Sequence, residues 1–458
     1  MKNNYTTQSL KICGNLWKSV GQNTTQSLKI CGNLWKSVGE NNTIPKNLWK
    51  SVKICGTIFL TLFSLYANAQ ENTTLQNAIA IAVKNNASLK NEQLKTELSS
   101  QLIKTYKPIA NTNLGFNIGQ INSIYIDNQV FASQTLSLPK VYNATKSLYT
   151  QAYLNALNGI TLKEIDLKKA VTENFYHQIY LAEKEKILLK MDTIYTEFLR
   201  KATLRLQKGE TNVVEKASAE IQKTNIQIQL NNLDEEKKVA QLTFQYLLNT
   251  QTIYAIKSAS LLMSDASILD TVSVQKHPML VQLQQQIETA KYSTALEKTK
   301  LLPEFSIGAN TGTIKGVGAN EKIYNGSYRF QQVQVGVALP IFNKAQKEKI
   351  KAYTLHENIA QKEYETKEIE FKNEVIVLLQ KHNTLKQNLA FYTNNLLPNA
   401  AIISTTANSQ FVNGEINYLE WTQLMHQTIQ VETNYIETIK LYNDNLIGLQ
   451  YLLNNPKN

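Results

Sequence analysis

The sequence predicts a mainly α-helical protein with a small β part, built from two copies of one unit of helix, strand, strand, long helix and helix. Three observations support this fold class. Long segments carry apolar residues at helical spacing, short proline-bounded segments alternate apolar with small or polar residues, and the same order of segments occurs twice. The pentapeptide QYLLN closes both copies, at Gln245 to Asn249 and at Gln450 to Asn454.

The first copy begins with a helical pattern over 75–107. Two strands follow, because apolar residues take alternate positions in 114–118 and in 130–138. From Pro139 to Gly209 there is neither a further proline nor a strong turn signal. About 70 residues at 1.5 Å each then predict a helix of about 100 Å.

The second copy has the same plan. A helix starts near His277, and alternating strands cover 305–309 and 333–339 with a Gly-rich loop between them. A long helix then runs to Gly414, with an interruption expected near Pro398. The last helix ends in the second QYLLN.

The two tips of the long helices confirm that the copies correspond. GETNVVE at 209–215 and GEINYLE at 414–420 are offset by 205 residues, as the pentapeptides are, and each Gly lies 36 residues before its QYLLN. This is an internal duplication. We therefore divide the chain into a leader at 1–69, a first repeat at 70–250, a linker at 251–275 and a second repeat at 276–458.

The leader has the layout of a secretory signal peptide. In KICGTIFLTLFSLYANAQ a basic residue precedes an apolar stretch and small residues, so Gln70 is the expected mature start. Upstream, TTQSLKICGNLWKSVG occurs twice, which we interpret as duplicated DNA or a misassigned start rather than a structural module. All three cysteines fall before Gln70, so the mature chain can form neither a disulfide nor a thiolate metal site.

The net charge of +12 does not indicate nucleic-acid binding. The leader holds eight lysines and one glutamate, which leaves 40 basic and 35 acidic residues in the mature chain, a net charge of +5. These charges interleave along helical segments, as on solvated faces. We expect no nucleic-acid partner.

The predicted strands have one apolar and one polar face, which suits a transmembrane β-barrel but also an ordinary soluble hairpin. Four strands are too few to close a barrel, since about eight is the practical minimum. A barrel reading therefore requires several chains to share one barrel. The secretory leader and the very long helices favour that reading.

From Leu75 to Asn454 the chain resembles the TolC-like outer-membrane efflux proteins. The resemblance rests on the duplicated order, on the helix-turn-helix segments RLQKGETNVVEKASAE and QFVNGEINYLEWTQLM, and on proline-bounded strands. The stretch from SLPKVYN through FLRKATLRLQKGETNVVEKASAE looks most like members paired with heavy-metal pumps of the resistance-nodulation-division type. The prolines that bound the strands are Pro108, Pro139, Pro303 and Pro340.

The resemblance implies a homotrimer in which three chains form a 12-stranded barrel in the outer membrane of a Gram-negative bacterium, continued by a periplasmic α-helical tunnel. It also implies a periplasmic adaptor protein and an inner-membrane pump as partners, with the chain as a passive exit duct for heavy-metal cations. A duct for small organic toxicants or for polypeptide secretion remains open, as does a soluble periplasmic coiled-coil scaffold.

The helix-turn-helix tips are the expected functional regions. A Gly at each tip permits the left-handed backbone that ends a helix tightly, and the resemblance makes the tips adaptor contacts. Glu215 and Glu420 are aperture candidates, because rings of carboxylates would favour cations, although a solvated carboxylate is the alternative. Gln423 is a further candidate, where the family often has an acidic residue. The tip residues are Lys208, Gly209, Glu210, Asn413, Gly414 and Glu415.

Nothing in the sequence predicts an enzyme, a cofactor or a bound metal. The mature chain's five histidines form no close pair with metal-ligand spacing, and Met425 and His426 are adjacent, so they point to different helix faces. No nucleophile–base arrangement or phosphate-binding loop is recognisable. The histidines are His177, His277, His356, His382 and His426.

Overall fold

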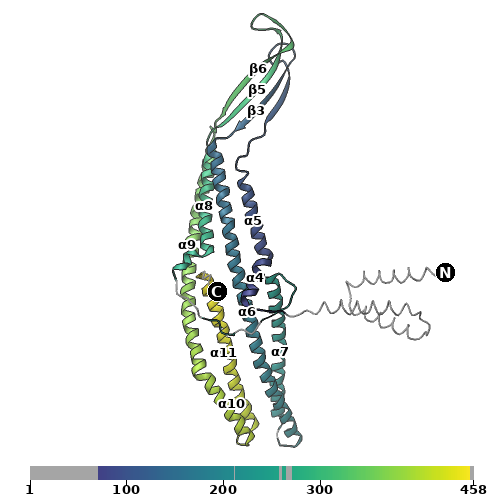
Figure 1. Cartoon of the computed structure of the whole chain (residues 1–458), viewed down its shortest axis with the longest axis vertical. Coiled ribbons are helices and arrows are strands. Elements are labelled where there is room, and N and C mark those ends of the chain that lie inside the picture. The colour runs from purple at the N-terminus through teal and green to yellow at the C-terminus, as the bar shows by residue number, and fades with distance from the viewer. Residues whose placement is uncertain (1–70, 211, 257–259, 265–270, 454–458) are drawn as a thin grey trace, which may run out of the picture. The chain divides into compact units, whose positions relative to one another are not determined.

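The computed structural model of the protein describes residues 71–210, 212–256, 260–264 and 271–453. The predicted leader with its repeats and cysteines, part of the predicted linker, and the last residue of the second QYLLN lie outside them. The described part consists mainly of long helices, with one four-stranded sheet and one two-stranded parallel sheet of β1 (Glu71–Thr73) and β4 (Tyr254–Ile256) (Figure 1). The predicted fold class is confirmed.

No helix that the structure describes combines the length and the apolar character needed to cross a bilayer.

The order of elements repeats as the sequence predicts. The first copy contains α4 (Leu75–Asn85), α5 (Ala87–Ile103), β2 (Asn113–Gly119), β3 (Asp127–Leu136), α6 (Pro139–Gln207) and α7 (Val213–Leu248). The second contains η1 (Thr271–Lys276), α8 (Pro278–Thr299), β5 (Glu304–Val317), β6 (Ile323–Ala338), α9 (Lys344–Phe391), η2 (Tyr392–Leu396), α10 (Leu397–Val412) and α11 (Tyr418–Leu452).

The helix predicted as continuous over 75–107 is divided into α4 and α5 at Asn86. The Asn86 side chain accepts hydrogen bonds from the backbone N–H groups of Ser88 (2.9 Å) and Leu89 (3.2 Å), so it caps α5. The same side chain donates to the Leu247 carbonyl at 3.1 Å. Asn86 thereby ties this break to the first QYLLN.

The four-stranded sheet has the order β2-β3-β5-β6, with antiparallel pairing throughout. The predicted Gly-rich loop is shorter than the sequence indicated, because β5 continues to Val317 and β6 starts at Ile323. Gly316 (φ 118°) and Gly326 (φ 90°) have positive φ angles, which glycine adopts more readily than other residues. The pairing register of β5 and β6 also shifts after Thr313. Glycine here permits an irregular hairpin end rather than ending the strands.

The two faces of the sheet differ as predicted. In one row Leu114, Ala132, Ala309 and Val333 lie opposite one another across the four strands, and in the next row the positions are held by glycine, phenylalanine, asparagine and glutamine. The apolar face is uncovered, since Leu114 is 76% exposed and Val335 74% exposed. A single chain therefore leaves a large apolar surface without a partner.

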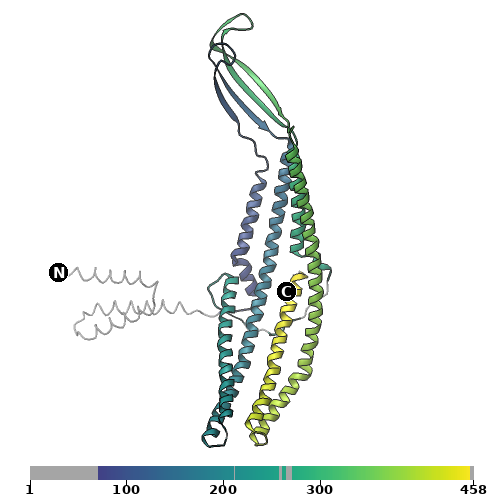
Figure 2. The same ribbon diagram turned by 180° about the vertical axis from the view of Figure 1, so that it is seen from behind.

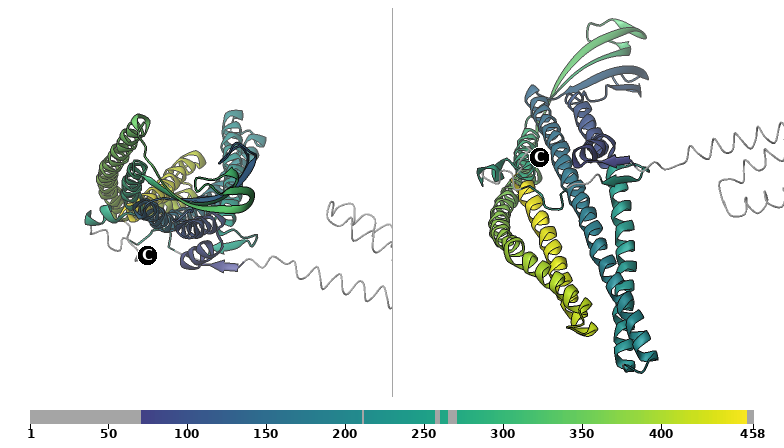
Figure 3. Two further views of the ribbon diagram at one scale, coloured as in Figure 1. Left: turned by 90° about the horizontal axis from the view of Figure 1, so that it is seen from above. Right: turned by 60° about the horizontal axis from the view of Figure 1, so that its bottom comes forward.

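The helices form two rows that share long helices (Figures 1 and 2). Next to the sheet the order is α5, α6, α8 and α9; toward the tips it is α7, α6, α11 and α10, with α11 also against α9. The sheet and the two tips stand at opposite ends of this unit, and the view from above shows the helices side by side rather than around one axis (Figure 3). The core accordingly lies between neighbouring helices.

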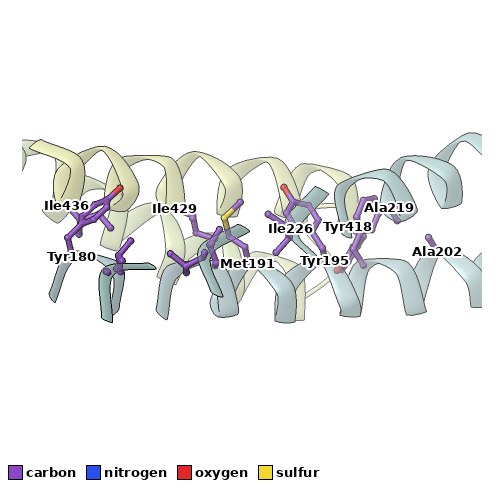
Figure 4. Packing of buried hydrophobic residues seen from close by; sticks show 14 residues of the cluster. Tyr180, Met191, Tyr195, Ala202, Ala219, Ile226, Tyr418, Ile429 and Ile436 are labelled. Atoms are coloured by element: carbon purple, nitrogen blue, oxygen red, sulfur yellow. The ribbon is translucent and has the colours of Figure 1, made fainter. Parts of the chain in front are cut away.

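The largest buried cluster joins α6, α7 and α11 in the half nearer the tips (Figure 4). Phe198 and Met191 of α6 pack with Ile226 of α7 and Ile429 of α11, each at most 9% exposed. These residues recur at helical spacing on each element, which places them on one face. The helical hairpin of the first copy (α6 and α7) is thus packed against that of the second copy (α10 and α11) along much of its length.

The long helix of the second copy is interrupted where the sequence predicts. A π-helical turn, η2, separates α9 from α10, and Pro398 follows at the start of α10. Proline has no N–H to donate and its ring crowds the preceding turn, which the wider π turn accommodates. Thr193 occupies the equivalent position of α6, which is one uninterrupted helix of 69 residues.

Each QYLLN ends a helix, and its leucines pack, as predicted. Leu248 is 0% and Leu452 1% exposed. In the first copy Asn249 takes the left-handed conformation (φ 48°) that closes the helix. The tyrosines differ, however: Tyr246 is 75% exposed, whereas the Tyr451 hydroxyl donates to Asp166 Oδ1 at 2.8 Å, and burial raises the pKa of Tyr451 above its usual value.

Tyr451→Phe is expected to lower the free energy of unfolding by about 1.5–2 kcal/mol, because it removes a hydrogen bond to a charged group. Tyr246→Phe is the matched control, and we expect no measurable change from it. Chemical denaturation of the purified protein in detergent, followed by circular dichroism, measures both. Equal effects from the two substitutions would contradict the structural difference between the two tyrosines.

Candidate functional site: the helical tips

The two tips have the same backbone geometry. At the first tip Gly209 has φ 74°, its N–H donates to the Leu206 carbonyl (3.1 Å), and the Glu210 N–H donates to the Arg205 carbonyl (2.9 Å). At the second tip Gly414 has φ 76° and equivalent bonds of 3.2 and 2.8 Å. This is the Schellman arrangement that glycine favours, so the predicted capping role of both glycines is confirmed.

The returning helices are capped equally. Asn212 accepts a hydrogen bond from the Glu215 N–H at 3.2 Å, and Asn417 accepts one from the Glu420 N–H at 3.0 Å. Asparagine is a preferred residue at the start of a helix because its side chain satisfies an otherwise free backbone donor. Each tip is therefore a tight turn fixed at both of its helix ends.

The two candidate aperture carboxylates have different partners. Glu215 forms an ion pair with Arg205 at 2.9 Å, and its side chain is only 16% exposed. Glu420 is exposed and accepts a hydrogen bond from the Asn417 N–H at 2.9 Å, which completes a capping box. Gln410 stands where the first tip has Arg205. Both carboxylates thus have a structural role within the chain. The predicted rings of carboxylates at an aperture remain a proposal.

The remaining predicted tip residues lie on the surface of the turns. Lys208, Glu210, Asn413 and Glu415 are all exposed, and the Asn413 side chain donates to Glu415 Oε1 at 3.3 Å. Gln423 is also exposed, one turn into α11. The structure therefore places six predicted contact residues at two neighbouring turns at one end of the unit (Figure 1).

An aromatic cluster near the second tip was not predicted. Phe198 of α6 lies 4.8 Å from Tyr418 of α11, centroid to centroid, and Phe411 lies 5.2–5.3 Å from Tyr418 and Trp421. The Lys201 ammonium stands 4.3 Å from the Phe411 centroid. The first tip has Leu206, Val213 and Lys216 at the equivalent positions. This difference between the two copies, which is visible in the sequence, could have indicated the aromatic cluster.

The histidine nearest the tips has a protein partner. Tyr195 Oη lies 3.2 Å from His426 Nδ1. Within the described ranges no three His, Cys, Asp or Glu side chains are grouped closely enough to hold a metal ion. Met425 is buried and His426 exposed, so the two adjacent residues face different directions.

Part of the sequence matches a protein family, and the fold is shared with solved outer-membrane channels. Residues 272–455 match the model of the family described as outer membrane efflux protein. Over these residues the chain is similar to outer membrane efflux proteins. The matched residues are those of the second copy, while the structural similarity extends over both. No curated protein matches the sequence significantly.

Three solved structures show how far the similarity extends. CusC, whose structures concern folding and transmembrane channel formation, has a TM-score of 0.68 and 17% identity, with 85% of this chain and 95% of that chain covered. The CmeC outer membrane channel of Campylobacter jejuni has a TM-score of 0.69 and 14% identity, with 90% of this chain and 88% of that chain covered. The outer membrane protein VceC of Vibrio cholerae has a TM-score of 0.67 and 10% identity, with 83% of this chain and 95% of that chain covered. The chain thus has the fold of these outer-membrane proteins.

Proposed function

We propose that this protein is an outer membrane efflux protein and forms the outer-membrane channel of a tripartite efflux system. It would be a passive exit duct for cargo delivered by an inner-membrane pump and a periplasmic adaptor. The observation that carries the proposal is the four-stranded sheet, with one uncovered apolar face and one polar face. An apolar outer face and a polar lumen are the requirements of a transmembrane barrel. The match of residues 272–455 to the outer membrane efflux protein family supports this location.

The open edges of the chain support assembly into a ring. β2 and β6 are the unpaired edge strands of the sheet. β2 follows α5 and β6 precedes α9, and these two helices end the row next to the sheet, so both layers have their open edges on the same sides. Head-to-tail contact between such edges forms a closed ring when the rotation from one copy to the next closes. Three copies would supply the 12 strands of a homotrimeric barrel.

Exposed side chains on the edge helices fit the same assembly. A groove of about 750 Å³ between α8 and α9 is lined by Met279, Leu283, Leu355 and Ile359. On α5, at the other edge, leucines four residues apart are exposed and have no cover in the single chain; they are Leu94, Leu98 and Leu102. Burying this row against the next copy's groove would remove both apolar surfaces from water.

We propose heavy-metal cations as the cargo and a resistance-nodulation-division pump as the energy source. This cargo rests on the sequence resemblance to heavy-metal members and on the carboxylates near the tips. The exposed turns at Gly209 and Gly414 are the proposed adaptor contacts. The polar face of the sheet carries neutral groups such as Asn310 and Gln332, which favours an unselective duct for small organic toxicants as the second candidate.

Planar-bilayer recordings test the duct. The purified protein is expected to insert and to conduct ions, and a deletion strain is expected to lose metal tolerance. Protein that stays soluble without detergent and gives no conductance would exclude the duct and favour a periplasmic scaffold. Normal metal tolerance with lost tolerance to organic compounds would instead assign the second cargo.

Substitution of Glu420 tests the aperture proposal separately from capping. Glu420→Gln retains a side-chain acceptor for the Asn417 N–H but removes the charge, whereas Glu420→Ala removes both and costs about 1 kcal/mol of tip stability. If Glu420 faces the lumen, both variants are expected to lower the cation-to-anion permeability ratio at least twofold. An unchanged ratio in Glu420→Gln would leave capping as the residue's role.

A further inference from the structure

The four connections between strands and helices, together with the helix ends that adjoin them, carry an unusual concentration of positive charge. We call them the junction collar, and they comprise residues 103–112, 137–147, 296–304 and 339–351. The collar holds ten lysines against three glutamates, a net charge of +7. Since residues 70–458 carry 40 basic and 35 acidic groups in all, everything outside the collar is net negative, at −2.

The collar lysines are available to a partner. All ten are exposed, and they come from four different connections that meet at one boundary between sheet and helices (Figures 1 and 2). Of the three glutamates, Glu297 is buried and bound by Lys300 and Lys349, and Glu348 pairs with Lys351. Lys104, Lys140, Lys298, Lys344 and Lys347 form no ion pair with any described residue.

Exposed apolar side chains stand beside these charges. Phe342 is 100% exposed, Ile341 73% and Leu339 62%, all in the connection from β6 to α9, and Ile109 is 60% exposed in the connection from α5 to β2. In the sequence, each of them lies between a strand of the sheet and the nearest collar lysine. Apolar anchors next to long cationic side chains are typical of a segment at the boundary between lipid tails and headgroups.

Tyrosines of the collar hold two of the lysines in place. The Lys107 ammonium lies 5.8 Å from the Tyr142 ring centroid, and the Lys146 ammonium lies 5.3 Å from that of Tyr106. Two connections that are 30 or more residues apart are thereby joined at the same level.

We propose that the junction collar binds anionic phospholipid headgroups of the leaflet on the helical side of the membrane. The proposal rests on the proposed function, which puts the sheet in the bilayer. The sheet's apolar face then fixes the depth of the chain, and the collar lies where phosphate groups begin. Each lysine near an anionic surface strengthens binding by about fivefold, and salt weakens the effect.

Lipid retention by the purified full chain tests the proposal. The protein is equilibrated in detergent micelles containing equal amounts of phosphatidylglycerol and phosphatidylcholine, and native mass spectrometry counts the lipids retained. The wild type is expected to prefer phosphatidylglycerol at least tenfold at low salt. The collar variant K104Q/K140Q/K344Q/K347Q is expected to lose most of that preference, and so is the wild type at high salt.

The matched control is K84Q/K90Q/K276Q/K381Q, which removes four exposed, unpaired lysines away from the collar. It is expected to stay within twofold of the wild type, with circular dichroism confirming that both variants fold. No preference in the wild type, or an equal loss in both variants, would overturn the proposal. So would a collar variant that keeps its lipid preference but no longer binds isolated peptidoglycan, since the partner would then be an acidic polymer.

Conductance separates this inference from the proposed function. Wild-type protein that conducts in pure phosphatidylcholine bilayers but shows no preference for phosphatidylglycerol would disprove the collar's role alone. Protein that inserts into no bilayer of any composition would disprove the duct itself.

Discussion

Arginine in place of Val335 is expected to prevent stable insertion of the protein into membranes. Val335 is 74% exposed, lies three residues before the end of β6, and stands opposite Ile307 on the apolar face of the sheet. An arginine on the lipid face costs up to roughly 2–4 kcal/mol, depending on its depth in the bilayer, and every copy in a barrel would carry it. Resistance of the membrane-bound protein to alkaline extraction measures the loss, together with conductance.

Gln334→Arg is the matched control, one residue away on the opposite face. Gln334 lies opposite Gly308 in the polar row, where an added charge would face water in a barrel. This variant is expected to insert normally and to change only ion selectivity. If Gln334→Arg blocked insertion and Val335→Arg did not, the assignment of the two faces would be reversed.

Acidification is expected to destabilise the helical part through His277. The ring is fully buried, and it contacts Phe371 and Tyr451 with centroids 4.9 Å away in each case. Burial lowers the pKa of His277 to about 4, against smaller opposite effects of the Asp166 carboxylate and the Tyr451 backbone. The folded state therefore resists a proton that the unfolded chain accepts.

The sign of the effect follows from that difference. Above about pH 6.5 the histidine is neutral in both states and does not affect the pH dependence. Between about pH 6.5 and pH 4 the unfolded state gains a proton first, so stability falls by up to roughly 3 kcal/mol. Denaturation of the purified protein at several pH values measures this slope.

His277→Asn is the informative variant. His277 Nδ1 accepts the Met279 N–H at 3.1 Å and so caps α8, a role that asparagine can take over. The variant will lose some packing at every pH, but its stability between pH 6.5 and 4 is expected to fall less steeply than that of the wild type. Parallel curves for the two proteins would show that another group controls the acid sensitivity.

Sequence patterns predicted the elements that depend on local chemistry. The helix between Pro139 and Gln207 follows from the absence of any breaking residue, and the two faces of the sheet follow from alternation. The break at Asn86 was missed because its side chain bonds to Leu247, more than 160 residues away. The added length of β5 and β6 was missed because pairing between strands outweighed the glycines.

At the tips, too, the features set by neighbouring residues were predictable, and those set by contacts between distant residues were not. The glycine caps were predictable from composition, and the pairing of Asn417 with Glu420, three residues apart, is a local signal that favours capping over an aperture role. By contrast, the contact of Phe198 with Tyr418 joins residues 220 positions apart. No periodicity within one helix can predict a contact between two hairpins.

The π turn before Pro398 has a consequence for symmetry. Because α6 has 69 residues and α9, η2 and α10 together also have 69, the duplication alone would make the two helical hairpins equivalent. One wide turn rotates the side chains beyond it by about 100° and shortens the helix by about 1.5 Å. A ring of three identical copies would then contain two alternating kinds of hairpin, and its symmetry would be threefold rather than sixfold.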